Sequence, residues 1–123
     1  MPTFLDQERA EHALKVVKGM KGNSVGDKFA KLTAGFTATL ISNGLGQSVA
    51  TLRAKQEPQY LALYEALQSW LCEGKPFMPV SNKELINHIV TADMRTYMQA
   101  QAEAISYVEW LKKFAAAYLK TPD

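Results

Sequence analysis

The chain has 123 residues, of which 47% are hydrophobic and 21% are charged. This balance is typical of a globular protein and excludes a disordered one, and the length predicts a single domain over residues 1–123. The formal net charge of +2 neither requires nor excludes a nucleic-acid partner, because a local basic surface matters more than the total.

The N-terminus and the single cysteine bear on location and redox chemistry. No basic stretch followed by an apolar run opens the chain, and no apolar run approaches the roughly 20 residues that cross a bilayer. We therefore expect no membrane contact and a cytoplasmic location. Cys72 cannot form an internal disulfide, and its place after Trp70 and Leu71 predicts a buried, inert thiol.

The first half of the chain predicts three helices. The first spans residues 4–19, where apolar side chains recur at helical spacing opposite a charged face. Glycines and Asn23-Ser24 then predict a turn. The second spans residues 27–42, and a third continues to residue 55. The second helix carries an apolar stripe, which consists of Phe29, Leu32, Phe36 and Leu40.

A glycine-containing stretch separates the second helix from the third. Gly44 and Gly46 lie in it, and a glycine weakens a helix interior by about 1 kcal/mol relative to alanine. A phosphate-binding loop would need a preceding strand and a following Lys-Ser/Thr, which are both absent. We therefore predict a structural bend at Asn43, Gly44, Gly46 and Gln47, in which Asn43 and Gln47 cap free backbone groups.

The second half of the chain predicts three more helices. A fourth starts at Pro58 and spans residues 58–71, since the first turn tolerates proline. A short fifth spans residues 85–90, where Ser81 and Glu84 fit a capping box.

The last helix is the longest and spans residues 93–119, with Asp93 as its cap. Its inner stripe is expected to be Met94, Met98, Ile105, Val108, Leu111, Ala115 and Tyr118. No segment alternates with the period of a strand. The sequence therefore predicts an all-α fold, a single-domain bundle of about six helices.

Motifs for catalysis or cofactor binding are missing. His12 follows Glu11, and His88 lies four residues after Glu84, but the repeated Glu-x-x-His of a di-metal bundle does not occur. We expect both histidines at the surface or its boundary. No nucleophile elbow, Walker loop or dinucleotide fingerprint appears, so we expect no enzyme activity, no metal and no cofactor.

Several segments carry a family resemblance in their order and spacing. Residues 40–52 with Arg53-Ala54-Lys55, residues 60–71 and residues 107–115 resemble the small helical subunit of the type III-B CRISPR RNA-silencing effector, the Cmr complex. The chain departs from that pattern in the segment Leu32-Thr33-Ala34-Gly35-Phe36, where many relatives have a proline. It also departs at Thr51, near a bulky apolar position, and at Gln101, where threonine is common.

The resemblance implies a structural role in antiviral defence. Such subunits stack side by side along the backbone subunits that carry the guide RNA, and lie beside the large polymerase-like subunit. They help to hold the target RNA paired to the guide RNA, whereas cleavage and second-messenger synthesis belong to other subunits. The implied partners are those subunits, further copies of this chain and the two RNAs, with no cofactor.

Basic residues in or beside these segments are the candidate contacts to RNA or to neighbouring subunits. They are Lys15, Lys18, Arg53, Lys55 and Lys112. Glu109 is expected to pair with Lys113 at i,i+4, which leaves Lys112 without an obvious partner. Lys21, Lys28 and Lys31 are further basic residues. Each basic residue of the chain taken singly, the five candidates included, is better explained as solvated surface.

Two other functions stay open. A helical protein–protein adaptor without RNA contact could use the same bundle and surface. A small DNA-binding protein would need a recognition helix with exposed base-reading residues after the bend, but that helix is rich in small apolar residues.

Overall fold

The computed structural model describes residues 4–79 and 84–119. This part of the chain contains helices and no strand, which confirms the all-α prediction. The elements are α1 (Leu5–Lys18), α2 (Val25–Lys55), α3 (Pro58–Gln68), a π-helix η1 (Ser69–Gly74), α4 (Leu85–Thr91) and α5 (Met94–Tyr118). The Ser81 of the predicted capping box lies outside the described residues.

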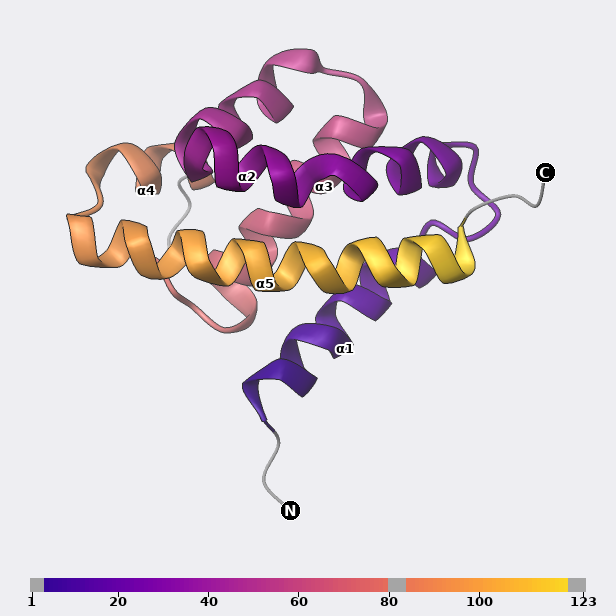
Figure 1. Cartoon of the computed structure of the whole chain (residues 1–123), viewed down its shortest axis with the longest axis horizontal. Helices are drawn as coiled ribbons and strands as arrows, with labels where there is room; N and C mark the ends of the chain where they lie inside the picture. Colours follow the sequence, from indigo (N-terminus) through magenta and orange to yellow (C-terminus); the bar gives the residue numbers. More distant parts are fainter. Residues whose placement is uncertain (1–3, 80–83, 120–123) are drawn as a thin grey trace.

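Helix α5 lies between α1 and α2, and α2 in turn contacts α3 and α4 (Figure 1). Helix α2 runs along one side of α5, and α1 crosses α5 on the other. Thr37 bonds Glu109, whereas Leu45 bonds Gln101, so rising numbers on α2 meet falling numbers on α5. Helices α2 and α5 are therefore antiparallel, and α3 packs against α2.

The inward face of α5 differs from the predicted stripe. Ala104, Tyr107 and Leu111 are fully buried, whereas Met94 is 81% and Met98 is 54% exposed. The prediction was wrong at both methionines, because they lie about a third of a turn away from the line of residues that faces the core. Tyr118 was also misplaced, since it is 43% exposed at the last residue of the helix.

The chain leaves helical geometry at Gly44, where φ is 83° and ψ is 163°. Residues other than glycine rarely adopt this region. The free amides after the bend are capped by α5: Leu45 N–H donates to Gln101 Oε1 at 2.9 Å, and Gly46 N–H donates to the Tyr97 hydroxyl at 2.9 Å. In the described residues Asn43 and Gln47 make no side-chain hydrogen bond, because α5 already supplies the caps.

A buried carboxylate joins α1, η1 and α5. Glu103 is 6% exposed, and its two oxygens accept from Arg9 Nε at 2.5 Å and Arg9 Nη2 at 2.8 Å. Trp70 Nε1–H donates to the same carboxylate at 2.8 Å. The hydrogen bond to Glu103 raises the pKa of Arg9, so the guanidinium stays charged. From the sequence alone, a glutamate is expected on a solvated helix face. Glu103 lies in the core instead, because Arg9 and Trp70 both donate hydrogen bonds to its carboxylate there.

The two histidines differ in burial, and the predicted surface or boundary position holds for His12 but not for His88. His12 lies at the boundary, with Nδ1 2.6 Å from the Tyr107 hydroxyl and Nε2 2.9 Å from the Ser69 hydroxyl. Burial, and then the nearby charge of Lys15, lower the pKa of His12. His88 is 6% exposed, so the prediction of a position at the surface or its boundary was wrong for this residue. Its helix α4 is short and lies with that side against the core.

Replacing Arg9 with leucine (Arg9→Leu) should lower the free energy of unfolding by about 3 kcal/mol, because it leaves the buried Glu103 carboxylate without its counter-charge. Urea denaturation followed by circular dichroism measures this. Adding Glu103→Gln removes the stranded charge and keeps an acceptor for Trp70, so the double variant should recover part of the loss. Equal stability of the single and double variants would contradict this explanation.

Gly44→Val should lower the free energy of unfolding by about 2 kcal/mol, because a branched side chain cannot adopt the Gly44 backbone without strain. The matched control is Gly35→Ala, since a Cβ at Gly35 would have no heavy atom within 4 Å. That control should be neutral or stabilising by up to about 1 kcal/mol. Thermal denaturation compares the two, and an unchanged melting temperature for Gly44→Val would contradict the strain at the bend.

Candidate nucleic-acid interface

The five candidate cations lie on three helices. Lys15 and Lys18 are on α1, Arg53 and Lys55 are in the last turn of α2, and Lys112 is on α5. All five reach solvent. They differ in what surrounds their charges, and this difference decides which of them can take up a new anion.

Arg53 is already engaged. Its Nε donates to Glu84 Oε2 at 3.0 Å, and the Tyr64 hydroxyl donates to the same oxygen at 3.2 Å. These two bonds, that of Arg53 first, lower the pKa of Glu84. Glu84 directly precedes α4, so the pair ties the end of α2 to the start of α4. Both side chains are nearly half exposed, so the pair adds little stability.

Lys112 also has a partner, which the sequence did not reveal. Its Nζ lies 3.9 Å from Glu109 Oε2, three residues earlier on α5. The same Glu109 oxygen accepts from the Thr37 hydroxyl at 2.6 Å. The expected pairing of Glu109 with Lys113 was therefore wrong: Lys113 Nζ lies instead 5.8 Å from the centroid of the Trp110 ring.

Lys15, Lys18 and Lys55 have no carboxylate partner within the described residues. Lys18 lies 5.9 Å from the ring centroid of Tyr118, and Lys21 lies 5.8 Å from the same ring. Lys55 lies 5.8 Å from the ring of Tyr60. An ammonium held at an aromatic ring keeps its charge available to solvent anions. The structure thus places Lys21 at the same tyrosine ring as Lys18, although the sequence had not singled out Lys21 as a candidate.

A groove between α2 and α3, which we name the α2–α3 groove, has a volume of about 410 Å³. Its lining from α2 is a single stripe at helical spacing, which consists of Lys28, Lys31, Leu32, Gly35, Phe36 and Thr39. Gln59 and Tyr60, from the first turn of α3, complete it. The spacing of Lys28, Lys31 and Gly35 was visible in the sequence, but the return of α3 onto this stripe was not.

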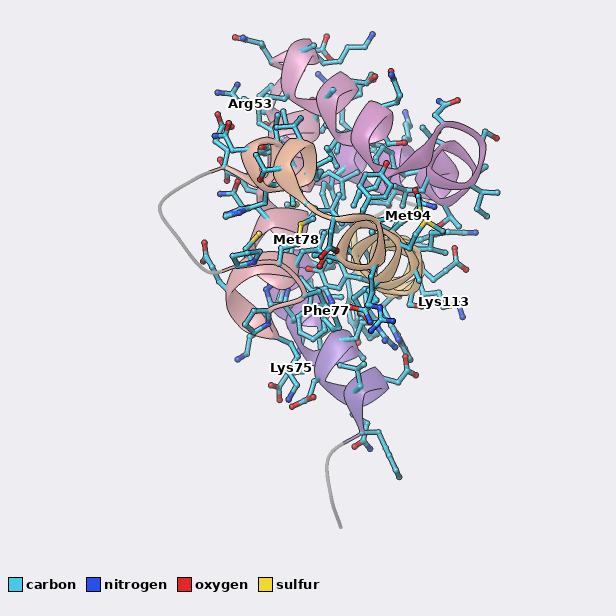
Figure 2. All side chains as sticks on the ribbon, turned by 90° about the vertical axis from the view of Figure 1, so that its left-hand side faces the viewer. Arg53, Lys75, Phe77, Met78, Met94 and Lys113 are labelled. Atoms are coloured by element: carbon cyan, nitrogen blue, oxygen red, sulfur yellow. The ribbon has the colours of Figure 1, made fainter. Side chains whose placement is uncertain are left out.

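Exposed apolar side chains gather at the α4–α5 corner. Val90 is 73%, Met94 is 81% and Met98 is 54% exposed. Figure 2 views the molecule from this end and labels Met94 at the start of α5. Single exposed apolar residues are ordinary, but Met94 and Met98 lie one turn apart on α5, shortly after Val90 on α4, and such a group is typical of a contact with another protein.

The remaining reactive groups have structural explanations. Cys72 is buried, and desolvation, followed by the charge of Glu73, raises the pKa of its thiol to about 11, as the predicted inert thiol requires. Among residues 4–79 and 84–119, His, Cys, Asp and Glu form no group of three that could hold a metal ion. None of the described helices combines the length and the apolar character needed to cross a membrane.

Comparison with known proteins identifies the family. The model of a family described as CRISPR-associated protein (Cas_Cmr5) matches residues 5–118. The fold is similar to the X-ray crystal structure of a CRISPR-associated Cmr5 family protein from Thermus thermophilus, with a TM-score of 0.83. That match has 19% sequence identity and covers 97% of this chain and 100% of the other. Because the family match spans most of the chain, the protein belongs to the Cmr5 family, the small subunit of the type III-B CRISPR effector, the Cmr complex.

Proposed function

We propose that this chain is a non-catalytic structural subunit that stacks along the backbone subunits of the Cmr complex and helps to hold target RNA paired to guide RNA. The observation that carries this proposal is the family match over residues 5–118. The rest of the assembly supplies its partners: the backbone subunits, the large polymerase-like subunit, further copies of this chain and the two RNAs. The cytoplasm is the compartment in which it would act.

The surface cations support an RNA contact of a particular kind. Lysines on rigid helices can neutralise phosphates without reading bases, and the guide RNA supplies the sequence specificity by pairing. Lys15, Lys18 and Lys55 are the stronger candidates, since their ammonium groups have no carboxylate partner in the described part of the chain. Arg53 and Lys112 would have to exchange Glu84 and Glu109 for a phosphate.

The exposed apolar corner supports contact with neighbouring subunits. A stack of identical subunits needs a head-to-tail interface that does not close into a ring. Val90, Met94 and Met98 offer apolar area for one side of such an interface or for a contact with a backbone subunit. The same side chains favour the second candidate, a protein–protein adaptor that never touches RNA.

Native mass spectrometry after co-expression with type III-B backbone subunits and guide RNA tests the subunit assignment. Incorporation in one or more copies is the expected result, and the measured mass gives the stoichiometry. A complex that assembles fully without this chain would contradict the proposal.

Lys18→Glu with Lys55→Glu should weaken the retention of target RNA by the assembled complex, because two phosphate-facing charges are reversed. Filter binding over a range of salt concentrations measures this, and the slope of log affinity against log salt should fall in magnitude by at least about 1.4. The matched control, Arg95→Glu with Lys113→Glu, makes the same change in net charge at two exposed residues of α5, and Lys113, like Lys18 and Lys55, lies at an aromatic ring. Normal assembly with unchanged RNA retention would favour the adaptor.

A further inference from the structure

The α2–α3 groove is positively charged along its α2 side. Lys28 and Lys31 both line it, and none of its lining residues is acidic. Two carboxylates lie close by: Asp27 Oδ2 is 3.4 Å from Lys31 Nζ, and Glu57 accepts from Gln59 Nε2 at 2.8 Å. The Lys31 side chain in the first pair is 73% exposed, so the pair is weak and a phosphate can compete for the lysine.

An aromatic ring closes the other side of the groove. Tyr60 is half-buried at the start of α3, and Lys55 Nζ lies 5.8 Å from its ring centroid. A ring flanked by ammonium groups is the arrangement that proteins use for single-stranded nucleic acid, in which bases stack on the ring while cations follow the backbone. Lys28 and Lys31 therefore share a groove with an aromatic ring that has Lys55 at its face.

The floor of the groove is open at Gly35. A Cβ at this position would have no heavy atom within 4 Å, so no packing within the described residues requires a glycine there. Glycine in a helix interior reduces helix stability, and no left-handed backbone angle accounts for it at Gly35. The close approach of a ligand to the α2 backbone is a physical reason for a bare position between the lysines and Tyr60.

We propose that the α2–α3 groove binds the sugar–phosphate backbone of single-stranded RNA, with Lys28 and Lys31 on phosphates and Tyr60 under a base. This inference rests on the proposed function and extends it to an unpaired segment of the RNA, because a base stacked on Tyr60 lies outside the guide–target duplex. It assigns the contact to Lys28, Lys31 and Tyr60, none of which is among the five candidates. The contact is independent of sequence, because lysines on phosphates and an aromatic ring under a base read no base edge.

The test uses the full chain and a fluorescent oligouridylate, with fluorescence anisotropy recorded from low to physiological salt. Lys28→Gln with Lys31→Gln should lower the slope of log affinity against log salt by about 1.4, which is about twentyfold in affinity at about 0.1 M salt. Gly35→Leu should fill the groove and weaken binding to a comparable degree while the net charge and the melting temperature are kept. Lys75→Gln with Arg95→Gln is the control of equal charge change and should retain most of the affinity.

Three results would overturn the proposal. One is an equal loss of affinity in the control, which would mean diffuse electrostatic binding. Another is full affinity in Gly35→Leu, which would place the RNA elsewhere. The third is the absence of binding by the unsubstituted chain even at low salt. Incorporation of the Lys28→Gln, Lys31→Gln chain into the Cmr complex is scored separately by native mass spectrometry, so the groove can fail while the subunit assignment holds.

Discussion

The buried Glu103 carboxylate is the interaction on which the arrangement of α1 depends. It accepts two bonds from Arg9 and one from Trp70, and so joins three elements at one point. A charge with so little exposure is tolerated only when its counter-charge and hydrogen-bond donors are all present. The stack of Trp70 on Tyr107, with 5.6 Å between ring centroids, continues this contact toward His12. The position of Lys15 and Lys18 on the surface follows from this docking.

The bend at Gly44 determines the second half of the surface. It redirects α2 so that the chain can turn back through α3, whose first residues then lie against the outer stripe of α2. Without that reversal Lys28, Lys31 and Tyr60 would not share a groove. Gln101, where the sequence departs from the pattern that it resembles, supplies one of the two caps, because its side-chain oxygen accepts from the Leu45 amide.

The apolar spacing predicted the helices well, since each has to bury a face, and the Asp93 cap is confirmed by its bond from the Thr96 amide at 2.8 Å. The π-helix η1 was missed, because nothing in local composition marks its extra residue per turn. The candidate interface was harder to predict. Arg53 pairs with Glu84, which lies 31 residues further along the chain. The pairing of Lys112 with Glu109 depends on which rotamer the lysine side chain adopts. Surface charges follow no periodic pattern in the sequence, so neither of these two ion pairs could be predicted from it.

The two tryptophans have an optical consequence. Trp110 donates its indole N–H to Asp6 at 2.8 Å, and Trp70 donates its own to Glu103, while Arg9 bridges both carboxylates. Trp70 is 2% exposed, so its emission should be shifted to the blue, whereas the partly exposed Trp110 emits at longer wavelength. Release of α1 would remove Asp6, the hydrogen-bond partner of Trp110, and would at the same time expose Trp70 to solvent. The native protein thus contains its own fluorescent reporter of whether its first helix is in place.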